Sequence, residues 1–274
     1  MRRMSEAPEV YLHGHHDSVL RSHQWRTAEN SAAYLLGELV PASRVLDVGC
    51  GPGTITADLA ARVPDGTVTG IDASPDVLDA ARREAVRRGQ RNVRFDAGDV
   101  YRLPYADGSF DVVHAHQVLQ HLSDPVAALA EMDRVCREGG VVAARDADYG
   151  GMFWHPADPG LDQWQDLYRR VARATGGEPD AGRRLAAWAR AAGFSRVRAT
   201  ASAWCYAAPE DSRWWGRLWA ERLTRSSFGD RAVEHGLATR QDLERLAGAW
   251  LRWGEMADAW FGIPHGEVLV RVTR

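Results

Sequence analysis

The sequence predicts an α/β protein in which a mostly parallel β-sheet carries helices on both of its faces. Short apolar runs alternate with amphipathic segments between residues 44 and 148, a pattern typical of successive β-α-β units. A glycine-rich stretch directly follows the first apolar run, as it does where a strand turns sharply into a helix. The chain of 274 residues is long enough to bury a full core around such a sheet.

The predicted elements of this region follow one another without a repeat or a low-complexity tract. Helical periodicity of the apolar residues separates helices from strands. The expected strands are 44–49, 67–72, 92–99, 110–115 and 139–148, and the expected helices are 54–63, 74–89 and 124–137.

The two ends of the chain differ from this central region. Residues 1–40 are expected to form a polar flap, Tyr11 to Arg26, followed by a helix after Thr27. A helix around Ala181 to Ala192 leads to a strand at 197–206, and the chain ends in a strand-like segment. We therefore expect a core of residues 41–206 and 266–274, with residues 207–265 inserted as a helical lid.

Composition excludes several classes of protein. The formal net charge of −3 and the scattered arginines argue against a nucleic-acid partner. No stretch of about 18 apolar residues suggests a membrane span. Three widely separated cysteines give neither a disulfide framework nor a zinc spacing. These observations predict a cytoplasmic protein with no nucleic-acid or membrane partner.

The glycine-rich stretch is the first candidate ligand site. It contains Gly49, Gly51 and Gly53, and Asp47 lies two residues before the first of them. This spacing differs from the G-x-G-x-x-G of dinucleotide-binding proteins, which seats a pyrophosphate on the helix N-terminus. The loop nevertheless lies at the carboxyl edge of the sheet, where open α/β folds bind ligands.

Two further carboxylates follow the next two strands. Asp72 ends the second strand at about the position where an acidic residue accepts ribose hydroxyls. Ser74 with Pro75 has the residue types of a helix N-cap, so we expect Asp72 to face a ligand instead. Asp99 follows the third strand and can accept a hydrogen bond from an adenine amino group.

These motifs together resemble the class I S-adenosylmethionine-dependent methyltransferases, and in particular the branch of the ubiquinone and menaquinone C-methyltransferases. The resemblance extends without interruption from residue 44 to residue 148, through VLDVGCGPGT, GIDASPDVLDAAR and the segment AGDVYRLPYADGSFDVVHAHQVLQHLSDP. It implies a Rossmann-like seven-stranded sheet whose last strand is antiparallel. It also implies S-adenosylmethionine as the cofactor.

The resemblance assigns roles to particular residues. It implies contacts with the cofactor from Asp47, Gly49, Gly51 and Gly53 at the methionine part, Asp72 with Ala73 at the ribose, Asp99 with Val100 at the adenine, and His116 with Gln117 at the sulfonium. Arg26 is expected to reach the methionine carboxylate when the flap closes. The region between the last two strands is longer than the usual hairpin of this family.

Histidines offer candidates for a base or a substrate contact. His116 follows the fourth strand and His155 follows the fifth, so we predict both as catalytic residues. His121 is expected to brace the turn after the fourth strand. His13, His15 and His16 fit one face of neither a helix nor a strand, which favours a solvated flap over a metal site.

A metal-dependent site is disfavoured in the rest of the chain. Asp146 and Asp148 follow the fifth strand, but the segment around His114 to His121 adds no carboxylate before Asp124. We therefore predict no metal.

The insertion contains six of the eleven tryptophans. Residues 210–223 and 239–253 place most of them at helical spacing, the second segment behind a Thr239 cap. Such stripes are either core or the wall of a ligand cavity. The lid interpretation predicts an apolar cavity bounded by the insertion, the segment Phe153 to His155 and the flap.

The nature of the acceptor stays open at this point. We expect methyl transfer to oxygen, nitrogen or carbon of a small apolar or aromatic metabolite. The alternatives are another reaction of a natural product in a site that retains the cofactor, and a macromolecular methyltransferase or binding module. The Asn-Pro-Pro-aromatic loop of enzymes that methylate base or amide nitrogens is absent, since residues 114–117 read HAHQ. A homodimer is an open alternative to a monomer.

Overall fold

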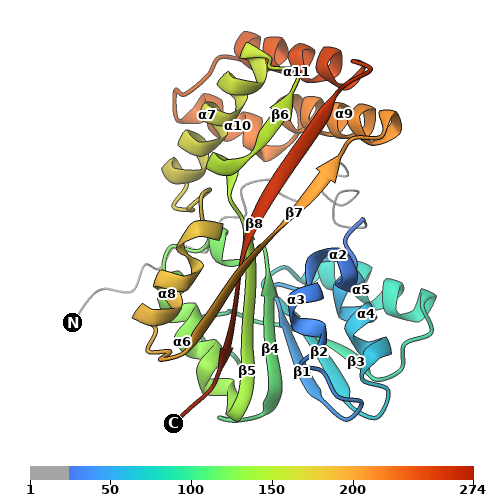
Figure 1. The fold of residues 1–274 in the computed structure, drawn as a ribbon, viewed down its shortest axis with the longest axis vertical. Helices are drawn as coiled ribbons and strands as arrows, with labels where there is room; N and C mark the ends of the chain where they lie inside the picture. The colour runs from blue at the N-terminus through green and yellow to red at the C-terminus, as the bar shows by residue number, and fades with distance from the viewer. Residues whose placement is uncertain (1–24) are drawn as a thin grey trace.

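A computed structural model describes residues 25–274 as a sheet-containing core with a helical cap at one end (Figure 1). The eight strands form one sheet in the order β3-β2-β1-β4-β5-β8-β6, with β7 paired to β8. The strands are β1 (Arg44–Val48), β2 (Thr67–Asp72), β3 (Val93–Ala97), β4 (Phe110–His116), β5 (Cys136–Ala147), β6 (Phe153–His155), β7 (Val197–Tyr206) and β8 (Trp260–Arg271). The first five are parallel, as the sequence predicts.

The last strand is antiparallel to its neighbours, as the family resemblance implies. β8 pairs with β5 from Val141↔Arg271 to Ala147↔His265 and with β7 along all ten β7 residues. The short strand β6 is an addition to the predicted seven. It pairs with the part of β8 that extends beyond the core toward the cap (Figure 1).

Helices cover both faces of the core sheet. One face carries α2 (Ala28–Ser31), α3 (Ala33–Leu36), α4 (Thr54–Arg62) and α5 (Pro75–Arg87), and the other carries α6 (Pro125–Val135) and α8 (Leu185–Ala191) (Figure 1). Each helix buries its apolar stripe on the sheet: Leu59 of α4 and Leu129 of α6 are fully buried. The layers leave the carboxyl ends of the parallel strands facing the cap.

The segment after Thr27 forms two short helices in place of the single helix that we predicted. Thr27 caps the first through a capping box with Asn30. The carbonyl of Asn30 would accept the Tyr34 N–H in a continuous helix, but it accepts a 2.6 Å hydrogen bond from the Trp204 indole instead. This contact ties the segment to β7.

The cap contains more of the chain than the predicted insertion. It combines β6 and α7 (Pro159–Ala174), which precede the insertion, with α9 (Pro209–Arg225), α10 (Ser227–Glu234) and α11 (Arg240–Gly254). Strand β8 begins at residue 260, inside the predicted lid of residues 207–265, because one long strand serves both the core sheet and the cap. The two predicted insertion helices are confirmed as α9 and α11, and Thr239 caps α11.

Most insertion tryptophans are core. Trp219, Trp250 and Trp253 are fully buried and pack around Trp164 of α7 and Phe261 of β8. Aromatic rings bury large apolar areas and gain further from edge-to-face contacts such as these. The cap is therefore a packed unit with its own core. Within residues 25–274, none of the helices is long and apolar enough to cross a membrane.

Candidate functional site

The glycine-rich loop connects β1 to α4 at the carboxyl edge of the sheet. Gly49, Gly51 and Gly53 all have positive φ, at 65°, 53° and 77°. A Cβ on Gly49 would overlap the Val118 side chain, and one on Gly53 would lie 2.8 Å from the Ala81 Cβ. The loop thus needs glycine both for its backbone conformation and for its close packing.

Asp72 stands beside this loop at the end of β2. Its carboxylate accepts hydrogen bonds from the backbone N–H of Gly51 and of Ser74, both at 3.0 Å. Ser74 occupies the N-cap position of α5, but its side chain makes no capping bond. The expectation that Ser74 relieves Asp72 of a structural role is therefore wrong, because Asp72 itself fixes both the loop and the start of α5.

The next carboxylate along the edge is Asp99, after β3. It accepts a hydrogen bond from the Tyr101 N–H at 2.9 Å, which shapes the turn that carries Val100. Val100 packs at the margin of the core cluster around α6, and Ala73 is exposed beside Asp72. The structure thus brings Asp72, Ala73, Asp99 and Val100 to one edge, as predicted.

Asp47 lies deeper than the other predicted cofactor contacts. Its carboxylate accepts a 2.6 Å hydrogen bond from the Thr56 hydroxyl and lies 2.9 Å from His114 Nδ1. All three side chains are buried. Asp47 therefore joins β1, β4 and α4 beneath the loop, and a direct contact with the cofactor stays a prediction.

His116 and Gln117 end β4 on the side of the cap. His116 is buried, packs against the rings of Trp204 and His265, and has no hydrogen-bond partner at either ring nitrogen among residues 25–274. Burial, together with Arg26 and Arg145, lowers the pKa of His116 well below 6.5. The ring is thus neutral at pH 7, the form that can accept a proton, although a low pKa makes a weak base.

Gln117 has the left-handed φ of 54°, which is uncommon for a residue other than glycine. Its side-chain oxygen accepts a 2.7 Å hydrogen bond from Arg26, and its Nε2 lies 2.9 Å from His265 Nε2. The Arg26 guanidinium also lies 5.5 Å from the centre of the Trp204 ring. Backbone strain of this kind concentrates at functional sites.

A cavity opens next to Gln117, between the core and the cap. Its narrow interior measures about 20 Å³, and about 350 Å³ with the space at its open mouth. It is lined by Arg26, Gln117, Ala147, Tyr149, Met152, Trp204, Tyr206, Trp215, Arg222 and Ile263. The insertion contributes to it, as predicted. The segment Phe153 to His155 does not, since the residues just before it line the wall instead.

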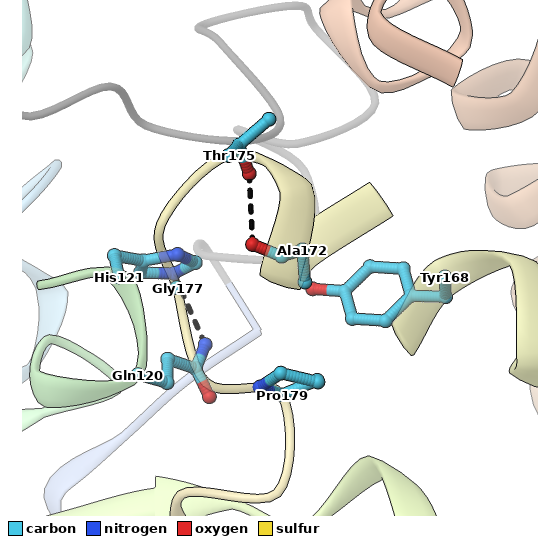
Figure 2. A pocket seen from close by; sticks show the side chains of 7 residues that line it. All are labelled: Gln120, His121, Tyr168, Ala172, Thr175, Gly177 and Pro179. Carbon is cyan, nitrogen blue, oxygen red and sulfur yellow. Dashed lines mark hydrogen bonds between the residues drawn. The ribbon is translucent and has the colours of Figure 1, made fainter. Parts of the chain in front are cut away.

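A second cavity lies under the end of α7. Figure 2 shows Gln120 and His121 bonded to each other and facing the α7 end at Ala172 and Thr175. Its narrow interior measures about 10 Å³, and about 270 Å³ with the space at its open mouth, so it is smaller than the cavity beside Gln117 on both measures. Burial lowers the pKa of His121 to about 3, so this histidine is neutral. Its packed position agrees with the predicted bracing of the turn.

The structure does not bring His155 to this site. His155 lies on β6 with about two thirds of its side chain exposed, and its Nε2 is 3.3 Å from the Asp258 carboxylate. The strand pairs with the cap end of β8, and the His155 side chain lies on the surface of the cap. Sequence position after the fifth strand suggested proximity, but the extension of β8 carries β6 away from the core.

The structure places the remaining sequence candidates away from this cavity or outside the described residues. Within residues 25–274 no group of three or more His, Cys, Asp or Glu side chains is arranged to hold a metal ion. Asp148 is bonded to the Arg183 guanidinium at 2.6 Å. His13, His15, His16 and most of the predicted flap lie outside the described residues.

Asp146 is a buried acid that the predicted site did not use. One carboxylate oxygen accepts a 3.1 Å hydrogen bond from the Gln120 N–H, and the other is buried with no partner in the described part of the chain. Burial raises the pKa of Asp146 to about 7. The side chain thus connects β5 to the turn after β4 and is partly protonated at neutral pH.

This shift predicts a pH-dependent stability. Between the ordinary Asp value of 3.8 and about 7, the folded chain holds a proton on Asp146 that the unfolded chain has released. The contribution of this group to stability therefore falls as pH rises through that window, by about 1.4 kcal/mol per pH unit. Asp146→Asn should remove that slope in urea unfolding curves measured from pH 5 to pH 6.5.

The control for this prediction is the comparison of the two proteins at each pH. His116 and His265 have lowered pKa values, so they add stability as pH rises toward 6.5 and oppose Asp146 in the wild type. Both histidines are the same in the variant. Parallel curves for wild type and variant would show that Asp146 does not titrate in this range.

Several residues of the site are not predicted from the sequence. Trp204 and His265 meet His116 and Gln117 only because β7 and β8 fold back beside β5. Tyr149 follows β5 directly and lines the cavity. Glu267 pairs with the buried Arg145 at 3.3 Å. No local motif marks these residues. A weaker signal was present in the sequence, because His265 and Glu267 interrupt an otherwise mostly apolar strand.

The residues present fit the nucleoside cofactor that the sequence implies. The loop glycines permit close approach of a ligand to the backbone, and carboxylates stand at the ends of β2 and β3. His116 presents two buried ring nitrogens at the end of β4, neither of them bonded to a described residue. Asp72 and the loop would hold the ribose and the amino-acid part, and the turn at Asp99 would hold the base.

Comparison with known proteins gives a consistent result. Residues 39–192 match a family model described as a methyltransferase domain. An uncharacterized methyltransferase of Schizosaccharomyces pombe is 36% identical over 270 residues, covering 95% of this chain and 96% of the relative. A demethylmenaquinone methyltransferase of Roseiflexus castenholzii is 36% identical over 57% of this chain and 63% of its own length.

Among solved structures, the protein YcgJ of Bacillus subtilis has a similar fold. The TM-score is 0.58 with 18% sequence identity, and the match covers 90% of this chain and 99% of the other. At this identity the likeness concerns the fold alone.

Proposed function

Because the chain belongs to the methyltransferase-domain family and is an S-adenosylmethionine-dependent methyltransferase, we propose that it methylates a small apolar or aromatic metabolite held between the core and the cap. The observation that most directly supports this proposal is the cavity beside Gln117. It adjoins the end of β4 on one side and aromatic rings of β7 and α9 on the other. Ligand cavities of small-molecule enzymes combine such apolar walls with a few polar groups.

The cofactor supplies an activated methyl group, so the protein's contribution is mainly position and exclusion of water. The loop and Asp72 fix the cofactor end, while Arg26 is suited to a carboxylate and bridges to Gln117 at 2.7 Å. Trp204, Tyr206 and Trp215 exclude water from the opposite wall. Entry of an acceptor into the narrow interior requires the Arg26 and Gln117 side chains to move.

As part of this proposal, His116 acts as a base when the acceptor must lose a proton. Its neutral ring lies next to Trp204, which lines the cavity, but His116 itself is not in the lining. A base is needed only for acceptors with an acidic proton. Carbon, nitrogen and oxygen acceptors are all compatible with this arrangement.

A labelled-methyl assay tests the proposal. The purified chain is incubated with S-adenosylmethionine that carries a labelled methyl group and with small-molecule extracts, and products are identified by mass. We expect a labelled small molecule together with S-adenosylhomocysteine. Turnover of a substrate without S-adenosylhomocysteine would favour a different reaction in the same site, and label on RNA or protein alone would favour a macromolecular acceptor.

A further inference from the structure

His265 lies where β8 passes from the core sheet toward the cap. It pairs with Ala147 of β5 on one side and with Ser202 of β7 on the other. Only 1% of the residue is exposed, and its ring packs against Trp204 and His116, with ring centres 4.4 Å and 6.2 Å away. These neighbours hold the ring in one orientation.

The hydrogen bonds of this ring define its tautomer. Nδ1 lies 3.0 Å from the backbone carbonyl oxygen of Ile263, which can only accept, so Nδ1 carries a proton. Burial, together with the charges of Arg145 and Arg26, lowers the pKa of His265 well below 6.5. The ring is therefore neutral at pH 7, and its Nε2 is an acceptor.

This acceptor fixes the side-chain amide of Gln117. The Nε2 atoms of Gln117 and His265 are 2.9 Å apart, so the amide nitrogen is the donor. The amide oxygen then accepts the 2.7 Å hydrogen bond from Arg26. If the amide oxygen and nitrogen were exchanged, oxygen would face the lone pair of His265 Nε2 and N–H would face the Arg26 N–H. Both bonds would be lost.

The backbone of Gln117 is held as well. Its N–H donates a 2.7 Å hydrogen bond to the carbonyl of Arg145, and its φ of 54° is one that glycine adopts without steric cost. A glutamine in this conformation is strained, and such strain persists where the surroundings hold a residue in place. Side chain and backbone are thus positioned together.

We propose that His265 is a positioning residue of the cofactor site, which fixes the Gln117 amide with its oxygen toward Arg26. His265 acts through Gln117 and not by contact with the cofactor. The inference rests on the assignment of Gln117 to the sulfonium end of the cofactor, and it holds for any acceptor.

Nitrogen-15 NMR of the full chain tests these bonds directly. The histidine rings are labelled, and the signals of His265 are assigned through its backbone. At pH 7 we expect the ring proton on Nδ1 and none on Nε2. A proton on Nε2 would overturn the inference, and this wild-type measurement decides even if every variant fails to fold.

Calorimetry with two probes tests the positioning role. S-adenosylhomocysteine extends to the Gln117 end of the cofactor site, whereas adenosine occupies only the base and ribose parts. His265→Leu removes the acceptor, so it should weaken S-adenosylhomocysteine binding about threefold to tenfold and leave adenosine binding unchanged. His265→Gln supplies an amide oxygen in place of Nε2 and should bind both probes as the wild type does.

A double-mutant cycle shows whether His265 acts through Gln117. Gln117→Gly removes the side chain but keeps the backbone conformation, because glycine accepts this φ. In that background His265→Leu should cause no further loss of affinity for S-adenosylhomocysteine. The control is His235→Leu, on an exposed histidine at the end of α10, which should bind both probes as the wild type does.

The outcomes are distinguishable. Equal losses for both probes in His265→Leu would indicate a structural role alone, and no loss or additive effects in the cycle would show that His265 does not act through Gln117. Each of these results would overturn the inference. A wild type that binds both probes as expected but methylates no small molecule would instead contradict the proposed function alone.

Discussion

Replacement of Trp250 by alanine is expected to lower the free energy of unfolding by about 3–5 kcal/mol, the range for large aromatic residues removed from a packed core. Trp250 is fully buried in α11 and packs on Trp164, Trp219 and Phe261, with ring centres 4.8–5.9 Å apart. The rings around it belong to three different elements, so collapse into the space is restricted. Urea unfolding followed by circular dichroism measures the change.

The neighbouring Leu251 provides a matched control. It is 45% exposed on the same helix, so Leu251→Ala should change stability by no more than about 0.5 kcal/mol. A small loss of stability in Trp250→Ala would show that the cap lacks a tightly packed core.

Trp215 gives the functional contrast because it lines the cavity. Trp215→Ala should raise the KM for the acceptor more than it weakens cofactor binding.

Replacement of Asp72 by alanine is expected to weaken S-adenosylhomocysteine binding about tenfold to a hundredfold, or about 1.5–3 kcal/mol. The variant loses a carboxylate suited to the ribose hydroxyls. It also loses the bonds to the Gly51 and Ser74 N–H groups, which hold the loop in place. Calorimetry of both proteins measures the effect.

Asp79 is the control for Asp72. It is an exposed carboxylate on α5 that pairs with Arg82 at the surface, so Asp79→Ala should bind S-adenosylhomocysteine as the wild type does. Equal affinity of the Asp72 variant and the wild type would remove Asp72 from the cofactor site and leave it a structural role alone.

Local patterns predicted the parallel part of the fold well. The alternation of strands and helices up to β5 and the cap at Thr239 depend on residues close in sequence, and all are present. The resemblance supplied the antiparallel last strand, which no periodicity reveals. Helices α7 and α10 and strand β6 were not predicted, since no secondary structure was expected for the residues that form them.

The positions of several site residues were predictable from the same local patterns, but their bonding partners were not. The loop glycines, Asp72 and Asp99 follow consecutive strands, so a parallel sheet brings them to one edge. The partners of these residues were less predictable. Asp72 also accepts a hydrogen bond from the backbone N–H of Gly51, and Gln117 accepts one from Arg26. His155 is far from the site because the length of β8, which sequence alone did not define, determines where β6 lies.

The most direct test of the account is a crystal structure of the chain with S-adenosylhomocysteine. We expect the ribose hydroxyls within hydrogen-bond distance of Asp72, the adenine at Asp99 and Val100, and the sulfur facing the cavity between Gln117 and the cap. A sulfur that faces away from this cavity, or a ribose held by residues other than Asp72, would contradict the assignment of both the cofactor site and the acceptor site.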